Sequence, residues 1–287
     1  MAKAAGKTGS GPTSLVAIEQ YFPEGERIIV DNLAHRLIPS GGVFLKMMRF
    51  NLVRDWMVKV TEKTFPGLWS CMMCRKKYID EKLINSVNDM EAVVNLGAGF
   101  DTRSFRLPEL SHIPVWEIDQ PKNIETKKKQ LDKIFESIPS NVKLVSIDFD
   151  HEDISIILKS HGYSINKRTF FIWEGVTQYL TEDGIRATFD FLTKAAPGSL
   201  LAFTYVLKDF IEGHNMYGWD KMYKEYVTNN IWIFGMEPET WPSFLKEYGW
   251  QVIEDISYEE IADKYVKPTG RKLASTQVER MIYVKKL

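Results

Sequence analysis

The sequence lacks the features that mark several classes of protein. No apolar run approaches the about 18 residues that a membrane-spanning helix needs. The formal net charge is -1, with 37 Lys and Arg against 38 Asp and Glu, so no basic field indicates binding to nucleic acid or to an anionic membrane. Residues 1–13 contain lysines and glycines but no apolar segment, so we predict a disordered tail there and no signal peptide.

Cysteine is scarce, with two residues in the pair Cys71 and Cys74. A zinc site needs about four ligands, and neither a second cysteine pair nor a histidine lies nearby in the sequence. A thioredoxin-type pair begins a helix after a strand, whereas this one lies within an apolar, helical stretch. We therefore predict no metal site and two buried, reduced thiols, as expected of a cytoplasmic protein.

Residues 91–103 carry the clearest pattern in the chain. A β-branched run ends at Gly97-Ala98-Gly99, and Asp101 follows. Continuous apolar runs of this kind are typical of buried parallel strands. The two glycines permit positive φ angles and the close approach of a ligand, and a helix beginning near Asp101 would point free N–H groups at that ligand. The pattern predicts a nucleotide-type binding turn.

The residues that follow favour an adenosine ligand over a dinucleotide. A dinucleotide turn would need a third glycine where this chain has Thr102, so a nicotinamide-dependent oxidoreductase is the weakest alternative. Three later strand candidates, 113–118, 142–147 and 168–173, each end at an acidic residue. Ligands of open α/β sheets bind outside the carboxyl ends of the strands, where these acids gather. The acids are Asp119, which suits ribose hydroxyls, Asp148, which with Phe149 suits an adenine ring, and Glu174.

These residues resemble a known family. The segments 94–103, 117–121 and 173–180 are similar to motifs of the leucine carboxyl methyltransferase-like family of class I S-adenosylmethionine (SAM)-dependent O-methyltransferases. Residues 31–34 are similar to its Asp-Pro-Leu-Ala motif, with Asn32 in place of proline, and residues 75–80 to its Arg-x-Arg-Phe-Ile-Asp motif. The resemblance spans roughly residues 16 to 287 and is strongest from 75 to 180.

The resemblance implies an α/β fold, a doubly wound, Rossmann-like sheet of seven strands with an antiparallel last strand. It implies SAM as cofactor and S-adenosylhomocysteine as product. It also assigns roles. Arg75 would bind the SAM carboxylate, Glu174 its amino group or main chain, and Tyr179 would line the methyl-transfer site on the acceptor side. The further cofactor-binding residues would be Gly97, Ala98 and Gly99 under the methionine part, Asp119 with Gln120 at the ribose, Asp148 and Phe149 at the adenine, and Asp101 beside the turn.

Each assignment has a structural alternative. The glycines could form an ordinary strand-to-helix turn, and Asp119 could cap the helix that Pro121 begins. Asp148 and Phe149 could be capping and core residues. Tyr179, as a lone aromatic residue, could be core. Arg75 is followed by Lys76 and Lys77, so an exposed basic helix face is its alternative.

Taken in order, residues 14–90 predict a helical cap and residues 91–287 a SAM-binding core. Within the cap, we expect 51–63 to form an amphipathic helix with Leu52, Val53, Trp56 and Val60 at helical spacing, and 68–88 to form a long helix. In the core, 207–241 departs from the strand–helix rhythm and is rich in aromatic residues. We expect this insert, with the cap, to form the acceptor pocket.

We predict a SAM-dependent O-methyltransferase acting on a carboxylate or hydroxyl of a small, partly apolar molecule, with no nucleic-acid or membrane partner. A carboxylate is ionised at neutral pH and needs no general base. A hydroxyl acceptor would need one, and His214 is the candidate. Carboxyl methylation of a protein C-terminus and a non-catalytic SAM-binding sensor remain alternatives. Nothing in the sequence predicts an oligomeric state.

Overall fold

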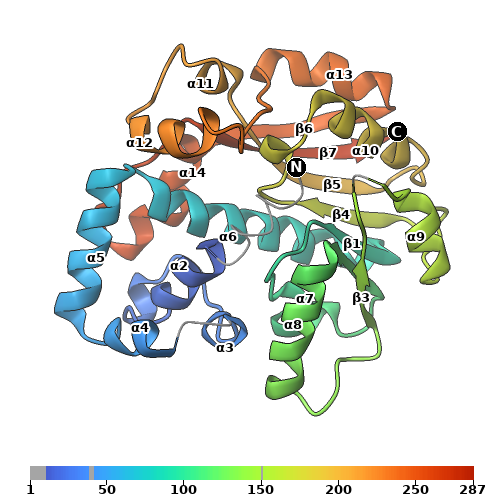
Figure 1. Cartoon of the computed structure of the whole chain (residues 1–287). Coiled ribbons are helices and arrows are strands. Elements are labelled where there is room, and N and C mark those ends of the chain that lie inside the picture. The colour runs from blue at the N-terminus through green and yellow to red at the C-terminus, as the bar shows by residue number, and fades with distance from the viewer. Residues whose placement is uncertain (1–10, 39–41, 150) are drawn as a thin grey trace.

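The computed structural model describes residues 11–38, 42–149 and 151–287, and its centre is a seven-stranded sheet (Figure 1). The strand order is β3-β2-β1-β4-β5-β7-β6. Strands β1 to β5 pair in parallel, and β7 runs antiparallel to both β5 and β6, as the resemblance implied. The strands are β1 (Ala92–Leu96), β2 (Val115–Asp119), β3 (Val142–Ser146), β4 (Thr169–Trp173), β5 (Leu200–Val206), β6 (Trp250–Ser257) and β7 (Glu279–Lys286).

The central strands are buried along their whole length because apolar layers cover both faces of the sheet. Successive side chains alternate between the two layers. Val93 belongs to the layer that includes the N-terminal helices, while Val94 belongs to the opposite layer. In β4, Phe170 and Phe171 alternate in the same way. The continuous apolar runs that predicted these strands therefore reflect burial on two sides.

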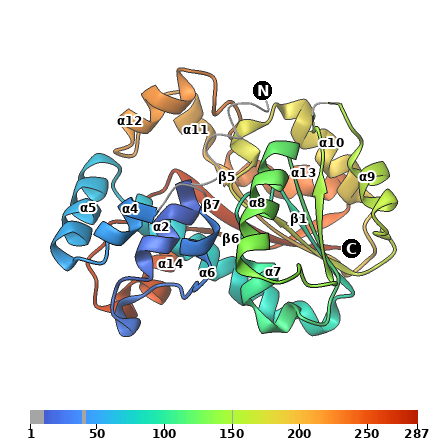
Figure 2. The same cartoon turned by 60° about the horizontal axis from the view of Figure 1, so that its bottom comes forward.

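The helices before the sheet gather at one side of the molecule in both views (Figures 1 and 2). They are α2 (Gly11–Glu19), α3 (Ala34–Leu37), α4 (Gly42–Met47), α5 (Asn51–Thr64) and α6 (Leu68–Ser86). The later helices are α7 (Arg103–Arg106), α8 (Pro121–Ile134), α9 (Ile154–Ser160), α10 (Glu182–Thr193), α11 (Lys208–Ile211), α12 (Asp220–Met222), α13 (Trp241–Glu247) and α14 (Tyr258–Tyr265). No helix in the described ranges is long and apolar enough to cross a membrane.

The first helix of the described residues extends into the expected tail. Residues 1–10 of that tail lie outside the described residues, but α2 covers Gly11–Glu19 and so includes residues 11–13 of the expected tail. Thr13 is buried, and its hydroxyl donates a 3.4 Å hydrogen bond to the Phe100 carbonyl beside the glycine turn. The N-terminal segment therefore reaches the centre of the molecule.

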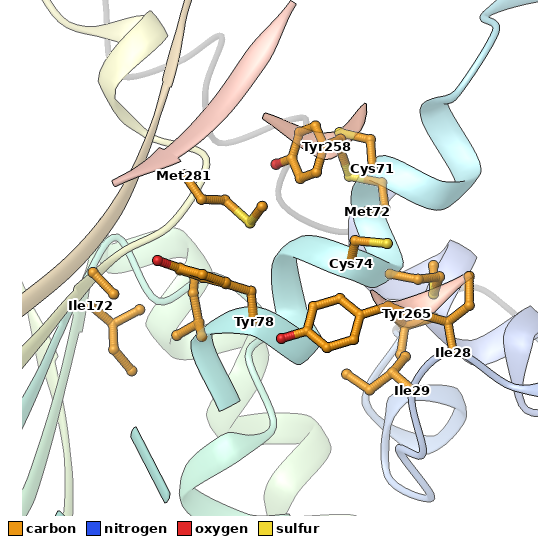
Figure 3. Close-up of a cluster of buried hydrophobic side chains, with 14 of the residues drawn as sticks. Ile28, Ile29, Cys71, Met72, Cys74, Tyr78, Ile172, Tyr258, Tyr265 and Met281 are labelled. Atoms are coloured by element: carbon orange, nitrogen blue, oxygen red, sulfur yellow. The ribbon is translucent and has the colours of Figure 1, made fainter. Parts of the chain in front are cut away.

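Helix α6 joins the N-terminal helices to the sheet (Figure 3). Its side chains Cys71, Met72, Cys74 and Tyr78 project into a cluster with Ile172 and Met281 of the sheet and with other apolar residues, Ile28, Ile29, Tyr258 and Tyr265. Both cysteines are buried free thiols, as expected. Burial raises the pKa of Cys74 to about 12, so this thiol stays protonated and unreactive at neutral pH.

Helix α5 differs from an ordinary amphipathic helix, which buries its apolar stripe. Leu52, Trp56 and Val60 face solvent, while Arg54 is buried. The Arg54 guanidinium donates a 2.5 Å hydrogen bond from Nη1 to the Tyr21 carbonyl and lies 4.0 Å from the centre of the Phe22 ring. The buried face of α5 is therefore anchored by an arginine, and its most apolar stripe is left uncovered.

Candidate functional site

The glycine turn after β1 is a fixed, sharply bent segment. Gly97 has φ +73° and Gly99 has φ +47°, both in the region that favours glycine. The N–H groups of Gly97 and Ala98 donate hydrogen bonds of 2.9 and 3.0 Å to the Ile118 carbonyl at the end of β2. A Cβ atom on Gly97 would lie 2.5 Å from Cγ2 of Val176. The turn is thus held between the ends of β2 and β4, and Gly97 has no room for a side chain.

Asp119 holds the turn and the next helix together. Its Oδ2 accepts a 2.6 Å hydrogen bond from the Gly99 N–H. Its Oδ1 accepts from the Gln120 N–H at 2.6 Å and from the Asn123 amide at 2.8 Å. Burial raises the pKa of Asp119, and these hydrogen bonds oppose the shift. A carboxylate has about four acceptor positions, so one position remains for a ligand hydroxyl.

A cavity opens beside this turn, at the carboxyl ends of β1, β2 and β4. It is lined by nine of the ten residues predicted to bind the cofactor and by Tyr179. The exception is Asp148, which is half-buried and is not among the lining residues, although its neighbour Phe149 is. The backbone N–H of Asp148 donates a 2.7 Å hydrogen bond to Glu152. The remaining lining residues are Pro12, Thr13, Lys76, Asn95, Leu96, Phe100, Asn123, Ile154, Trp173, Gly175, Val176, Leu180 and Thr188.

Arg75 is buried on α6 and bound by two carboxylates. Its Nε donates to Glu174 at 2.9 Å, and its Nη1 donates to both oxygens of Glu279 at 3.0 and 3.1 Å. The alternative of an exposed basic helix face is therefore wrong for Arg75, and also for Lys76, which is buried. Lys76 lines the cavity, and its Nζ lies 3.4 Å from Glu174 Oε1.

Arg103 is the centre of the same ion network and was not assigned a role from the sequence. Its Nη1 donates 2.6 Å hydrogen bonds to both Asp101 and Glu174, and its Nε donates a 2.6 Å hydrogen bond to Asp80. Burial by itself would raise the pKa of Glu174, but the nearby cations Lys76, Arg103 and Arg75 outweigh it and lower that pKa to about 2. Glu174 is therefore ionised at neutral pH.

The network connects the separated motifs of the sequence. Asp31 accepts a 2.6 Å hydrogen bond from the Thr102 hydroxyl, which brings residues 31–34 against the glycine turn. Asp80, from residues 75–80, binds Arg103 of that turn. Arg103 lies within the motif 94–103, and that position could have indicated a role in the site. Glu279 lies 204 residues from Arg75 in the sequence, outside every motif, so nothing in the sequence indicated its role.

Tyr179 lies where the cavity meets the aromatic insert. It is half-buried in the 3-10 helix Thr177–Tyr179, and its ring meets that of Trp232 edge to face, with 6.3 Å between ring centres. The Ile233 N–H donates a 2.8 Å hydrogen bond to the Gln178 carbonyl, which fixes the insert beside Tyr179. None of residues 207–241 lines the cavity. Their aromatic rings instead pack on one another, as Phe210 does on Trp232.

His214 does not suit the role of general base. Its side chain is 71% exposed, and its Nδ1 lies 3.5 Å from Glu212. It is not among the residues that line the cavity. The structure thus places the only histidine that we considered for proton abstraction outside the site.

The donor set of the cavity suits a ligand with several distinct parts. Cations at one end, Arg75 and Lys76, can bind an anionic group, and Glu174 beside them can bind a cationic one. Asp119 can accept from hydroxyl groups, and the apolar side chains of Phe149 and Ile154 can cover a flat ring. An amino acid joined to a nucleoside has these parts.

The amino-acid sequence matches the family model described as leucine carboxyl methyltransferase over residues 10–193. A protein of Mycobacterium avium (strain 104), named "Putative S-adenosyl-L-methionine-dependent methyltransferase", is 30% identical over 210 residues, which are 72% of this chain and 68% of that protein. A protein of Mycobacterium sp. (strain JLS) with the same name is 31% identical over 204 residues, 69% of this chain and 66% of that protein.

Solved structures with the same fold have low sequence identity. A DUF574 family protein from Streptomyces avermitilis aligns with a TM-score of 0.57 and 11% identity, over 80% of this chain and 88% of that chain. A Thermobifida fusca protein described as a "putative methyltransferase" aligns with a TM-score of 0.55 and 15% identity, over 83% of this chain and 89% of that chain. The family match and the sequence relatives agree with the motifs that build the cavity, and this chain belongs to the leucine carboxyl methyltransferase family.

Proposed function

We propose that this protein transfers a methyl group from SAM to a carboxylate or hydroxyl oxygen of a small, partly apolar molecule in the cytoplasm. As a member of its family the protein is a methyltransferase, and the relatives above are named for their dependence on SAM. SAM supplies a methyl group on a positively charged sulfur, already activated for transfer. Three parts of the proposal go beyond family membership: that the methyl group is transferred to oxygen, that the acceptor is a small molecule, and that the protein is cytoplasmic.

The residues of the cavity fit SAM part by part. Asp119 would accept from a ribose hydroxyl, and Phe149 would lie against the adenine. Gly97 and Gly99 would let the methionine part approach the backbone. At the far end Glu174 would bind the amino group and Arg75, together with Lys76, the carboxylate. Because Arg75 already binds two carboxylates, Lys76 has more capacity for a further anion.

One observation favours a carboxylate acceptor over a hydroxyl. Among the described residues that line the cavity there is no histidine and no cysteine. Its acids Asp101, Asp119 and Glu174 are all engaged with cations or N–H donors. Asp119, which keeps one acceptor position, is assigned to the ribose of SAM, so no acid of the site is left to take a proton from an acceptor hydroxyl. A carboxylate is ionised at neutral pH, with an ordinary pKa near about 4, so transfer to it needs alignment and exclusion of water only.

Tyr179 supports an acceptor that is partly apolar. It lies on the cavity wall, and its ring continues into the aromatic cluster of Trp232 and Tyr226. An acceptor seated against Tyr179 would therefore meet aromatic surface on the side of the insert. The acceptor's apolar part would be covered there while its oxygen faces the methyl group.

The test is transfer of radiolabelled methyl from SAM to panels of small carboxylic acids and phenols, followed by mild alkali. A carboxyl methyl ester releases the label as volatile methanol, whereas a methyl ether keeps it. We expect label that alkali releases, and much less of it with the Asp119→Ala variant when the SAM concentration is kept below that variant's Kd. Label on nitrogen would contradict the proposal. Tight SAM binding with no transfer to either panel would favour a sensor, and transfer only to peptides with a free C-terminus would favour a protein acceptor.

A further inference from the structure

Helices α4 and α5 carry an uncovered apolar surface, here called the α4–α5 surface. It consists of Phe44, Met47, Phe50, Leu52, Trp56 and Val60, whose exposed fractions are 48, 49, 68, 87, 65 and 42%. The other large apolar side chains exposed in the described ranges are scattered over the fold, at Val30, Ile156, Ile253 and Leu287. Exposed apolar side chains gathered on one segment mark an interaction site more often than single exposed residues do.

The orientation of this surface is fixed from the inside. Leu45 and Met48 of the same segment are buried in the core. The Arg54 guanidinium is anchored on the Tyr21 carbonyl and the Phe22 ring. Hydrogen bonds from the Phe50 N–H to the Met47 carbonyl, at 3.1 Å, and from the Arg54 N–H to the Phe50 carbonyl, at 3.0 Å, close the turn between the helices. Rotating the apolar stripe inward would break these contacts, so its exposure is built into the fold.

The rim of the surface is basic, although the whole chain carries a net charge of -1. The exposed cations are Lys46, Arg49, Lys59 and Lys63. The exposed acid of the segment, Asp55, is paired with Arg54 at 3.2 Å. Glu62 turns inward, where it accepts hydrogen bonds from the N–H groups of Gly67 and Ala274 at 3.4 and 3.0 Å. Helices that lie in a lipid interface have this composition, with Trp, Phe and Leu on one face and Lys and Arg along its border.

We propose that the α4–α5 surface docks the protein on an anionic lipid bilayer. In both views α5 lies at the outer edge of the molecule (Figures 1 and 2). The basic rim complements anionic headgroups, because Lys and Arg side chains close to such a surface are attracted to its negative charge. A symmetric dimer through the same surface would instead bring two basic rims together, with eight like charges facing one another.

Lipid docking would bring the methyl-transfer site to a place where apolar acceptors concentrate. The docking surface lies on the segment from α4 to α5, and no residue that lines the cavity belongs to that segment. The two sites are therefore separable by mutation. A variant can lose vesicle binding and keep SAM binding and methyl transfer, and another can lose SAM binding and keep vesicle binding.

The test is flotation of the full chain with vesicles of phosphatidylcholine alone and of phosphatidylcholine mixed with phosphatidylserine. We expect salt-sensitive binding to the anionic vesicles only. Trp56→Gln and the pair Lys59→Glu with Lys63→Glu should each lower the partition coefficient at least tenfold. The matched controls are Ile156→Gln, an equally exposed apolar residue elsewhere, and the pair Lys128→Glu with Lys194→Glu, which changes the net charge by the same amount. Both should bind vesicles as the unmodified chain does.

Calorimetric titration with SAM checks that every variant is folded. Absence of binding to anionic vesicles would overturn the proposal, as would equal losses in the surface variants and their controls. Sedimentation velocity of the same samples tests whether a second copy of the chain binds the α4–α5 surface instead. Concentration-dependent dimers that Trp56→Gln abolishes, without vesicle binding, would assign the surface to a second copy of the chain. Neutral vesicles bound as well as anionic ones would contradict the role of the basic rim.

Discussion

The Gly99 N–H donates a 2.6 Å hydrogen bond to the carboxylate of Asp119, 20 residues later in the chain. This bond joins the glycine turn after β1 to the acid at the end of β2. The same carboxylate also holds the start of α8 through Gln120. One side chain therefore shapes the turn and presents an acceptor to the cavity, so its loss affects cofactor binding in two ways.

Asp119→Ala is expected to weaken SAM binding by about 2 kcal/mol or more, because a buried charged acceptor is lost and its donors are left without a partner. This corresponds to an increase in Kd of roughly thirtyfold. Calorimetric titration measures it. Glu125→Ala on the exposed face of α8 is the control and should leave Kd unchanged. An unaltered Kd in Asp119→Ala would remove this residue from the cofactor site.

Phe149 and Asp148 were predicted together as adenine contacts, and the structure separates them. Phe149 lines the cavity and Asp148 does not. Phe149→Ala is therefore expected to raise the Kd for SAM about tenfold through lost contact with the ring, a change of about 1.4 kcal/mol. Asp148→Ala should change it less than threefold. The same titration compares them, and a larger effect at Asp148 would restore its assignment to the adenine.

The buried network predicts a large stability difference between two arginines. Arg103→Met leaves Asp80, Asp101 and Glu174 without their common partner inside the protein. Breaking a buried ion pair in this way costs about 3–5 kcal/mol of unfolding free energy. Arg186→Met, which removes exposed pairs with Glu182 and Glu247, should cost less than about 1 kcal/mol. Urea unfolding measures both, and similar values for the two variants would contradict the network's role.

Glu174 predicts a defined pH dependence. Its folded pKa is about 2, below the ordinary value of 4.5, so the ionised form stabilises the folded protein. This contribution is fully present above about pH 4.5 and is lost as the pH falls toward 2. Glu174→Gln cannot titrate, so the unfolding free energy of the unmodified chain should exceed that of the variant most above pH 4.5. Denaturant unfolding across this range measures the difference, and a gap that does not shrink toward low pH would contradict the assignment.

The sequence predicted the parallel strands and most of the cavity because both depend on local patterns. A continuous apolar run that ends in glycine or an acid determines where a strand stops, and the ends of adjacent parallel strands meet at one edge. The acids Asp119 and Glu174 were found in this way. Helix α14 was not predicted, although Ser257 and Glu260 form a capping box that the sequence displays.

The partners of the cations could not be predicted, because they depend on contacts between distant segments. Arg75 and Glu279 meet only when β7 inserts between β5 and β6. The stripe of Leu52, Trp56 and Val60 has the same spacing whether it faces the core or solvent, and the choice depends on Arg54 finding Tyr21 and Phe22. Net charge likewise gave no sign of a local basic rim, since acids elsewhere in the chain balance it.

We expect Gly97→Ala to lower the free energy of unfolding, and a second change at Val176 to restore part of it. In Gly97→Ala the new Cβ would lie 2.5 Å from Cγ2 of Val176, and φ of +73° is itself costly for alanine by about 1–2 kcal/mol. Val176→Ala removes the two methyl groups, and the nearest remaining atom, Cβ, lies at an ordinary 3.6 Å. The double variant should therefore be more stable than the sum of the single changes predicts, because the clash is gone and only the cost of the backbone angle and that of the lost valine methyl groups remain.

Urea unfolding of the two single variants and the double variant gives this coupling directly. A positive coupling would show that Gly97 is required by the approach of Val176 as well as by the turn. Strict additivity would mean that the backbone angle alone requires glycine there, and that the chain following β4 can move away from the turn without loss of stability.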